Sequence, residues 1–221
     1  MGLKILTVHG WAFCPEVFKP LEGLGDVGHH RLEYKSLGEE VQRLVERIDG
    51  DTLLVGWSLG ATLSVLASLE NPPKGLVLIG ATPHFGRAWK REYLERFFKE
   101  LEGNFGGKVR EFRNLVWGEE ICEDLPPEEG AKELLREFVQ TDISNPLREL
   151  RIPTLLLHGR KDPIVPFREA KKVLKLNPRF RLTVYDGGHF PKDFTPRDWE
   201  GVFESLQELP PLGCPAEEGG R

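Results

Sequence analysis

The sequence has one methionine, three cysteines and no apolar run near the roughly 18 residues that a membrane-spanning helix needs. The cysteines, Cys14, Cys122 and Cys214, are odd in number and lack metal-site spacing. We therefore expect reduced thiols, no metal and no organic cofactor. The first residues, MGLKILTVHGW, are too short and too strand-like for a secretion signal. Together these absences predict a cytoplasmic protein without a membrane span.

An excess of positive charge is also missing. The 35 Asp and Glu outweigh the 30 Lys and Arg, which gives a net charge of −5 over 221 residues. A global positive field, which would attract nucleic acid, is therefore absent, and we expect no nucleic-acid partner. Hydrophobic residues make up 39% and charged residues 29%, as in globular chains that bury their own core. We expect one large domain and a monomer.

Short apolar runs alternate with amphipathic stretches along most of the chain. The runs predict buried strands, and the stretches between them have helical spacing. Strands that are apolar throughout and alternate with helices are typical of a parallel sheet covered on both faces. The predicted strands are residues 4–8, 31–34 (a weak one), 52–57, 75–81, 153–158 and 181–185, and the predicted helices are residues 37–48, 59–69, 167–174 and 197–209.

One segment breaks the alternation. Residues 84–145 contain no strand pattern and predict two to four helices, which we interpret as a cap inserted after the third strong strand. The predicted core then consists of residues 1–83 and 146–209. Residues 210–221 hold three prolines and three glycines, which predicts a disordered tail.

The sharpest motif is Gly56-Trp57-Ser58-Leu59-Gly60, which has the pattern G-x-S-x-G. A predicted strand precedes it and a predicted helix follows it. In this context the serine occupies a tight, strained turn that exposes its hydroxyl group, and the glycines avoid clashes with neighbouring backbone. The motif predicts that Ser58 is a nucleophile. The alternative is an ordinary turn in which Ser58 only caps the helix.

A serine nucleophile needs a base, and the base needs a carboxylate that orients it. His189 follows a predicted strand and two glycines, at the kind of strand end where such sheets place catalytic groups. Asp162, just beyond the strand at 153–158, is the preferred carboxylate, and Asp186 is the competitor. Asp186 is only three residues from His189, but residues that close on one loop need not face each other.

Acyl transfer also needs an oxyanion hole. We expect one backbone N–H donor from Leu59, the residue after the nucleophile, and the other from Trp11, in the loop after the first strand. His9 is expected to support that loop by hydrogen bonding. Trp11 and Trp57 are candidates for the wall of the substrate pocket, and core packing is an equally good interpretation of both.

These motifs, in their order along the chain, resemble the α/β-hydrolase superfamily over residues 4–209. The resemblance implies an α/β-hydrolase fold, here with about six mostly parallel strands flanked by helices, and a helical cap. A narrower resemblance is to the BioH-type pimeloyl-acyl carrier protein methyl ester esterases of biotin synthesis. It rests on the serine motif and on His9-Gly10-Trp11, Thr82-Pro83-His84-Phe85 and residues 142–147. Ala61 departs from that family, which often has a second glycine there.

The narrower resemblance implies a serine carboxylesterase that cleaves a methyl ester through an acyl-enzyme, with acyl carrier protein as a partner. It also makes Phe85, at the entrance to the cap, a candidate for substrate binding. Two alternatives stay open: a short-chain carboxylesterase for small esters without a carrier protein, and a receptor with this fold that binds a ligand without turning it over. A complete catalytic triad argues against the receptor.

The cap sequence carries its own charge signal. Residues 84–113 contain eight Lys or Arg and five Glu, a local balance of +3. Arg87 and Arg91 are four apart and are predicted to share a helix face, and with Arg96 they are candidates to dock an acidic carrier protein. The alternative is a solvated helix with ion pairs between residues four apart. The opposite face is apolar and is expected to pack on the pocket: Leu94, Phe97, Phe98 and Leu101.

Overall fold

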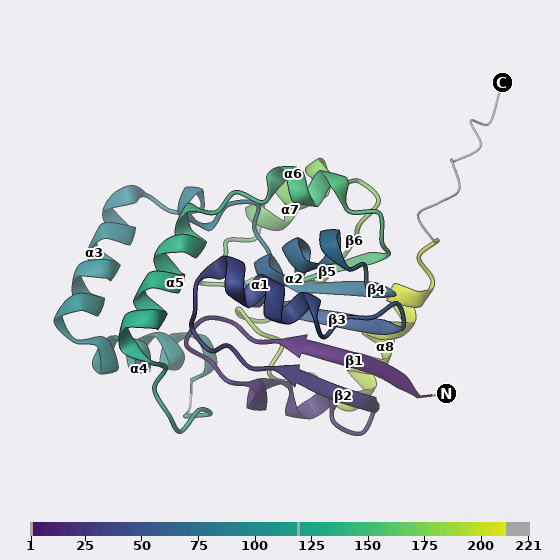
Figure 1. Cartoon of the computed structure of the whole chain (residues 1–221), viewed down its shortest axis with the longest axis horizontal. Helices are drawn as coiled ribbons and strands as arrows, with labels where there is room; N and C mark the ends of the chain where they lie inside the picture. The colour runs from purple at the N-terminus through teal and green to yellow at the C-terminus, as the bar shows by residue number, and fades with distance from the viewer. Residues whose placement is uncertain (1, 119, 211–221) are drawn as a thin grey trace.

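The computed structural model describes residues 2–118 and 120–210. Within these residues six strands form one sheet in the order β2-β1-β3-β4-β5-β6, and every neighbouring pair is parallel. The carboxyl ends of the strands therefore meet at one edge, toward which the arrowheads in Figure 1 point. The strands are β1 (Leu3–Val8), β2 (Gly25–His30), β3 (Thr52–Trp57), β4 (Gly75–Ile79), β5 (Thr154–Gly159) and β6 (Arg181–Tyr185).

Helices cover both faces of the sheet (Figure 1). One face packs against α1 (Leu37–Val45), α2 (Leu59–Glu70), α6 (Ser144–Glu149) and α7 (Arg168–Leu176). The other packs against the 3-10 helix η1 (Pro15–Leu21) and α8 (Pro196–Gln207). Because side chains alternate across a strand, Leu54 enters the first core and Leu53 and Val55 enter the second. Strands buried on both faces explain the continuous apolar runs of the sequence.

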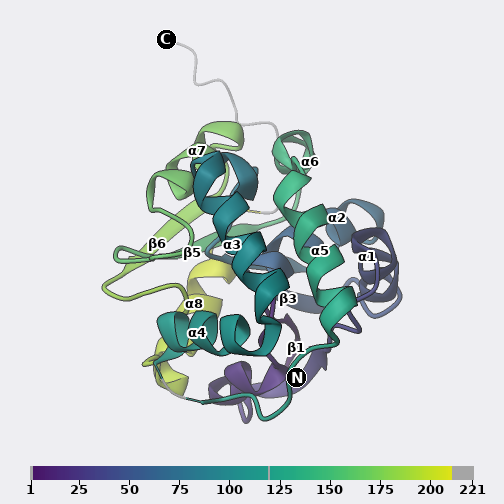
Figure 2. The same ribbon diagram turned by 90° about the vertical axis from the view of Figure 1, so that its left-hand side faces the viewer.

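Between β4 and α6, three α-helices and a short 3-10 helix of the described residues form the cap. They are η2 (Phe85–Arg87), α3 (Arg91–Gly103), α4 (Phe105–Trp117) and α5 (Glu128–Gln140). Figure 2 looks onto this cap, which lies over the carboxyl edge of the sheet. The sequence predicts two to four helices here; the exact domain boundaries stay predictions.

The second strand was predicted in the wrong place. It lies at Gly25–His30 rather than at residues 31–34. Its sequence, GDVGHH, has no apolar run, because β2 is an edge strand whose only buried side chain is that of its last residue, His30. Leu32 and Tyr34 are buried alternately, as in a strand, yet they pair with no other strand of the described residues.

The prediction of reduced thiols was also wrong for two cysteines. Cys14 and Cys122 form a disulfide, with Cα atoms 5.9 Å apart and a sequence separation of 108. The pairing depends on the cap returning to the loop after β1, which spacing alone does not reveal. Cys214 lies outside the described residues, and so does the predicted tail from residue 211 on. In the part that the structure describes, no helix combines the length and apolarity needed to cross a membrane.

Candidate active site

Ser58 lies between the end of β3 and the start of α2, in a strained backbone conformation. Its φ of 56° and ψ of −117° are uncommon for a residue with a side chain and cost on the order of 1–3 kcal/mol. A Cβ atom on Gly56 would approach Ser64 Oγ to 2.4 Å, and one on Gly60 would approach the Val8 carbonyl oxygen to 2.2 Å. The predicted reason for both glycines is therefore confirmed: the turn has no room for side chains beside the serine.

A buried carboxylate and a buried imidazole face each other across the ends of β5 and β6. Nδ1 of His189 lies 2.7 Å from Oδ2 of Asp162. The other oxygen of Asp162 accepts hydrogen bonds from the N–H groups of Ile164 and Val165, both at 2.8 Å. Burial alone would raise the pKa of Asp162, but the His189 imidazole and the two N–H donors more than offset it, so this pKa lies below its usual value. Asp162 is therefore held as a carboxylate.

The competing carboxylate has another partner, and a neighbouring histidine lies near Asp162, with 3.6 Å between Nε2 of His158 and Oδ2 of Asp162. Asp186 is exposed and forms an ion pair with Lys161, with 3.0 Å between Oδ1 and Nζ. Nε2 of His158 lies 2.8 Å from the Val165 carbonyl oxygen, so this ring packs under the loop that carries Asp162. Of the two candidate carboxylates, the structure places only Asp162 against His189.

Ser58 and His189 both lie against the end of β4. The Ser58 N–H group donates to the Ile79 carbonyl at 2.9 Å. The His189 ring lies so close to Gly80 that a Cβ atom there would be 2.8 Å from its Cε1. Among the described residues, Nε2 of His189 is buried and has no hydrogen-bond partner. Because Nδ1 is bonded to Asp162, Nε2 is the nitrogen that can accept a proton from a group at the end of β3.

His9 fixes the loop after β1, as expected. Its Nδ1 lies 2.9 Å from the Gly10 carbonyl oxygen and its Nε2 accepts the Leu32 N–H at 3.2 Å, which requires the neutral ring. Burial lowers the pKa of His9 to about 4. Because a peptide group is planar, holding the Gly10 oxygen also fixes the direction of the Trp11 N–H. The Leu59 N–H, in the first turn of α2, has no acceptor within its helix.

An apolar cavity of about 220 Å³ opens between Ser58 and the cap. Trp11 and Phe85 line it, and so do Phe97 and other members of the apolar α3 face, while Trp11 is also part of a hydrophobic core cluster. The described lining contains no charged side chain. The rest of the wall was not predicted from the sequence. In α5 the spacing of Leu135, Phe138 and Val139, three and four residues apart, is a signal that could have revealed part of it. The residues that were missed are Trp89, Tyr93, Phe112, Leu115, Leu135, Phe138, Val139, Pro163 and Ile164.

Trp57 does not reach this cavity. Its side chain is completely buried in the core beside η1 and α8, with ring centroids 4.7 Å from Phe13 and 4.8 Å from Phe190. The indole N–H donates to the His189 carbonyl at 3.0 Å. Core packing is thus the correct interpretation, because the ring is enclosed by other core side chains and does not line the pocket. Trp57 contributes indirectly by holding the loop of His189.

The three cap arginines are exposed and already paired within the chain. Arg87 donates to Asp142 at 2.8 Å. In α3 the ion pairs join residues four apart: Arg91 with Glu95, and Arg96 with Glu100. The prediction that Arg87 and Arg91 share a helix face was wrong, because α3 begins at Arg91 after an extended residue and Arg87 belongs to η2.

Comparison with known proteins gives matches that span most of the chain. The sequence model of the alpha/beta hydrolase family matches residues 5–195. A pimeloyl-[acyl-carrier protein] methyl ester esterase from Nitrosomonas europaea is 27% identical over 93% of this chain and 96% of its own length. An esterase of the same name from Stenotrophomonas maltophilia is 30% identical over 86% of this chain and 87% of its own.

Solved structures share the fold at lower identity. A hydrolase from Oleispira antarctica superposes with a TM-score of 0.77 at 15% identity, and an esterase from Exiguobacterium antarcticum with 0.76 at 18% identity. Each comparison covers 94% of this chain and 92% of the other. At these identities the likeness concerns the fold.

Proposed function

The chain belongs to the alpha/beta hydrolase family, and we propose that it is a serine carboxylesterase whose nucleophile is Ser58. His189 is the general base, and Asp162 orients it. One observation carries the proposal: the serine stands at a strained turn against the end of β4, where a buried imidazole has one nitrogen bound to a carboxylate and the other without a hydrogen-bond partner among the described residues. This is the arrangement by which a serine hydroxyl is activated as a nucleophile.

In the acylation step the Ser58 oxygen attacks the ester carbonyl while His189 Nε2 takes the hydroxyl proton. The negative charge that develops on the carbonyl oxygen is stabilised by the N–H groups of Leu59 and Trp11. When the tetrahedral intermediate collapses, the bond to the alcohol breaks and His189 returns its proton to the leaving oxygen. Asp162 stabilises the imidazolium present between these two transfers.

In the deacylation step water replaces the alcohol. His189 Nε2 removes a proton from this water as its oxygen attacks the acyl carbon, and the same two N–H groups stabilise the second oxyanion. Collapse breaks the bond to Ser58, whose oxygen recovers the proton from His189. The products are a carboxylic acid and a free enzyme with the same protonation as at the start.

For the substrate we propose the methyl ester of a pimeloyl group carried on acyl carrier protein, consistent with a role in biotin synthesis. The names of the relatives from Nitrosomonas europaea and Stenotrophomonas maltophilia support it. The apolar cavity supports it as well, because a wall without charged side chains accepts methylene groups and an uncharged ester more readily than an ionised acid. Trp11 and Phe85 would contact this acyl chain. The cytoplasmic location and the monomeric state stay predictions from the sequence.

A short-chain carboxylesterase without a carrier protein is the second candidate. The pairing of Arg87, Arg91 and Arg96 with carboxylates of the chain itself favours it, because a carrier protein would have to compete for those cations. The two candidates share their chemistry and differ in the acyl substrate and the partner.

A fluorophosphonate probe and an ester panel test the proposal. Wild-type protein should react covalently at Ser58, and Ser58→Ala should lose both labelling and ester hydrolysis, the latter by about 10⁴-fold or more, because the triad acts as a unit. The panel should include a methyl ester of an acylated carrier protein and small p-nitrophenyl esters. Hydrolysis by Ser58→Ala at a tenth of the wild-type rate would exclude the serine mechanism, and an unlabelled, inactive wild type would favour the receptor.

A further inference from the structure

The loop after β1 is attached to the cap at three points. The Trp11 indole N–H donates to the Ala131 carbonyl of α5 at 2.8 Å. Next along the chain, the Ala12 carbonyl accepts a hydrogen bond of 2.6 Å from Nε of Arg113, a residue of α4. Cys14 is linked to the cap by the disulfide. Residues 11–14, which include the proposed oxyanion donor Trp11, are thus held by parts of the cap that are about 100 or more residues away in sequence.

Arg113 is unusual among these attachments because it buries a charge. Its side chain is 5% exposed, and its two terminal nitrogens donate to the carbonyls of Cys122 and Asp124 at 3.0 and 2.8 Å. Within the described residues no carboxylate forms an ion pair with it at 4 Å or less. A cation buried among neutral carbonyls costs more desolvation free energy than an apolar side chain of similar volume. Stability alone therefore gives a poor account of this residue.

The acceptor of its shortest bond is strained. Ala12 has a φ of 64°, in the left-handed region that residues with a Cβ atom rarely adopt. Such a conformation persists only where surrounding contacts determine it. His9 holds the Gly10 carbonyl, which shares a peptide group with the Trp11 N–H, and Arg113 holds the carbonyl of the residue after Trp11.

We infer that Arg113 is a positioning residue for the oxyanion hole, which acts through the Ala12 carbonyl to keep the Trp11 N–H aimed at the reacting ester. This inference rests on the proposed esterase function. A misplacement of about 1 Å at such a donor can cost on the order of 100-fold in rate.

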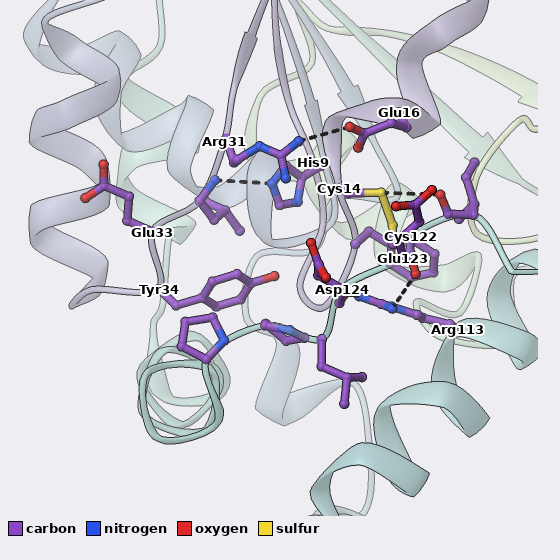
Figure 3. Close-up of a pocket in the computed structure, with 16 residues that line it drawn as sticks. His9, Cys14, Glu16, Arg31, Glu33, Tyr34, Arg113, Cys122, Glu123 and Asp124 are labelled. Atoms are coloured by element: carbon purple, nitrogen blue, oxygen red, sulfur yellow. Dashed lines mark hydrogen bonds and ion pairs between the residues drawn. A yellow bond between two sulfur atoms is a disulfide. The ribbon is translucent and has the colours of Figure 1, made fainter.

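A second cavity, of about 410 Å³, lies beside the guanidinium group of Arg113. Figure 3 shows Arg113, Tyr34, His9 and the disulfide around it. Its described lining shares no residue with the apolar cavity at Ser58. The Arg113 side chain itself is therefore not part of the described substrate wall. Truncation to alanine opens a space that a small guanidinium ion can enter from this cavity.

The test compares Arg113→Lys, Arg113→Met and Arg113→Ala with Arg110→Met, a control at an exposed arginine of the same helix. Three quantities are measured with p-nitrophenyl butyrate: kcat, KM and inhibition by a trifluoromethyl ketone, whose adduct with serine carries an oxyanion. For the Met and Ala variants we expect kcat to fall by about 10- to 100-fold and inhibition to weaken by a similar factor, with KM within about twofold. Arg110→Met should match wild type.

Chemical rescue separates positioning from stability. Methylguanidinium at about 20 mM, far below denaturing concentrations, should raise kcat of Arg113→Ala and leave wild type unchanged. Folded Arg113 variants with wild-type kcat and inhibitor binding would overturn the inference. So would a fall in kcat without weaker inhibition, or failure of all three variants to fold, since either result assigns Arg113 another role. Failure of the proposed function itself is seen separately, as activity that survives Ser58→Ala.

Discussion

Nδ1 of His189 lies 2.7 Å from Oδ2 of Asp162, although their positions differ by 27, whereas Asp186, three positions before His189, pairs with Lys161. The sheet explains this choice. Strands β5 and β6 are parallel neighbours, so the loop after β5, which carries Asp162, meets the loop after β6, which carries His189. Asp186, at the start of the loop after β6, faces solvent. Proximity in three dimensions and not in sequence selects the partner of the imidazole.

Exchange of the two carboxylates for amides should therefore have unequal effects. Asp162→Asn should lower kcat by about 10³- to 10⁴-fold, because the amide neither holds the correct tautomer of His189 nor stabilises the imidazolium. Asp186→Asn removes only an exposed ion pair, which is worth less than about 1 kcal/mol, and should leave kcat within twofold. Steady-state kinetics of both variants, with circular dichroism as a check of folding, measure this. The opposite ranking would show that the acid is misassigned.

The pKa of His9 predicts a pH dependence of stability. Burial lowers this pKa to about 4, whereas the unfolded chain takes up the proton near the ordinary value of about 6.5. Between these values the unfolded state binds more protons, so the free energy of unfolding falls as the pH falls from about 6.5 to 4. The loss attributable to His9 reaches about 3 kcal/mol at pH 4.

Urea unfolding at pH 7 and pH 4.5 measures this loss in wild type and in His9→Asn. The variant keeps a side-chain N–H for the Gly10 carbonyl but cannot titrate, so its free energy of unfolding should depend less on pH. Other histidines titrate in both proteins, and the difference between the two slopes isolates His9. Parallel pH profiles would contradict the assignment.

The disulfide predicts a dependence on reductant. Cross-linking residues 108 apart restricts the unfolded chain and stabilises the fold by about 5 kcal/mol in the loop-entropy account. Cys14→Ser should therefore lower the urea midpoint and abolish its sensitivity to dithiothreitol, while Cys214→Ser should keep both wild-type properties. Urea midpoints with and without dithiothreitol measure this, and a wild-type midpoint unaffected by the dithiol would contradict it.

The features that the sequence predicts are those that local pattern determines. The buried strands β3, β4 and β5 appear as continuous apolar runs because both faces are covered, and the turn at Ser58 is visible because its glycines are adjacent in sequence. Parallel order then brings the ends of these strands together. This is why the fold class, the serine and its two proposed partners were all accessible without coordinates.

The features that it misses depend on contacts between distant segments. β2 has no core-facing run at the sheet edge, and Cys14 meets Cys122 only after the cap has folded over the loop. Arg113 is one of eight basic residues in a charged stretch, and nothing in its neighbours shows that it alone is buried. The role of Trp57 is ambiguous in the sequence, because it depends on the direction in which the side chain points at the end of β3.

The last prediction separates the two proposed substrates through the cap arginines. If Arg87 and Arg91 dock an acidic carrier protein, Arg87→Glu with Arg91→Glu should raise KM several-fold for a carrier-linked methyl ester and leave p-nitrophenyl butyrate unaffected. The KM of wild type for the carrier substrate should also rise with salt, because the Debye length falls from about 10 Å at 0.1 M to about 3 Å at 1 M. Arg181→Glu is a matched control, since it breaks an exposed ion pair at the amino end of β6, away from the cap. A general loss of stability would lower both activities together. An equal response of the two substrates, or none, would therefore favour the carboxylesterase without a carrier protein.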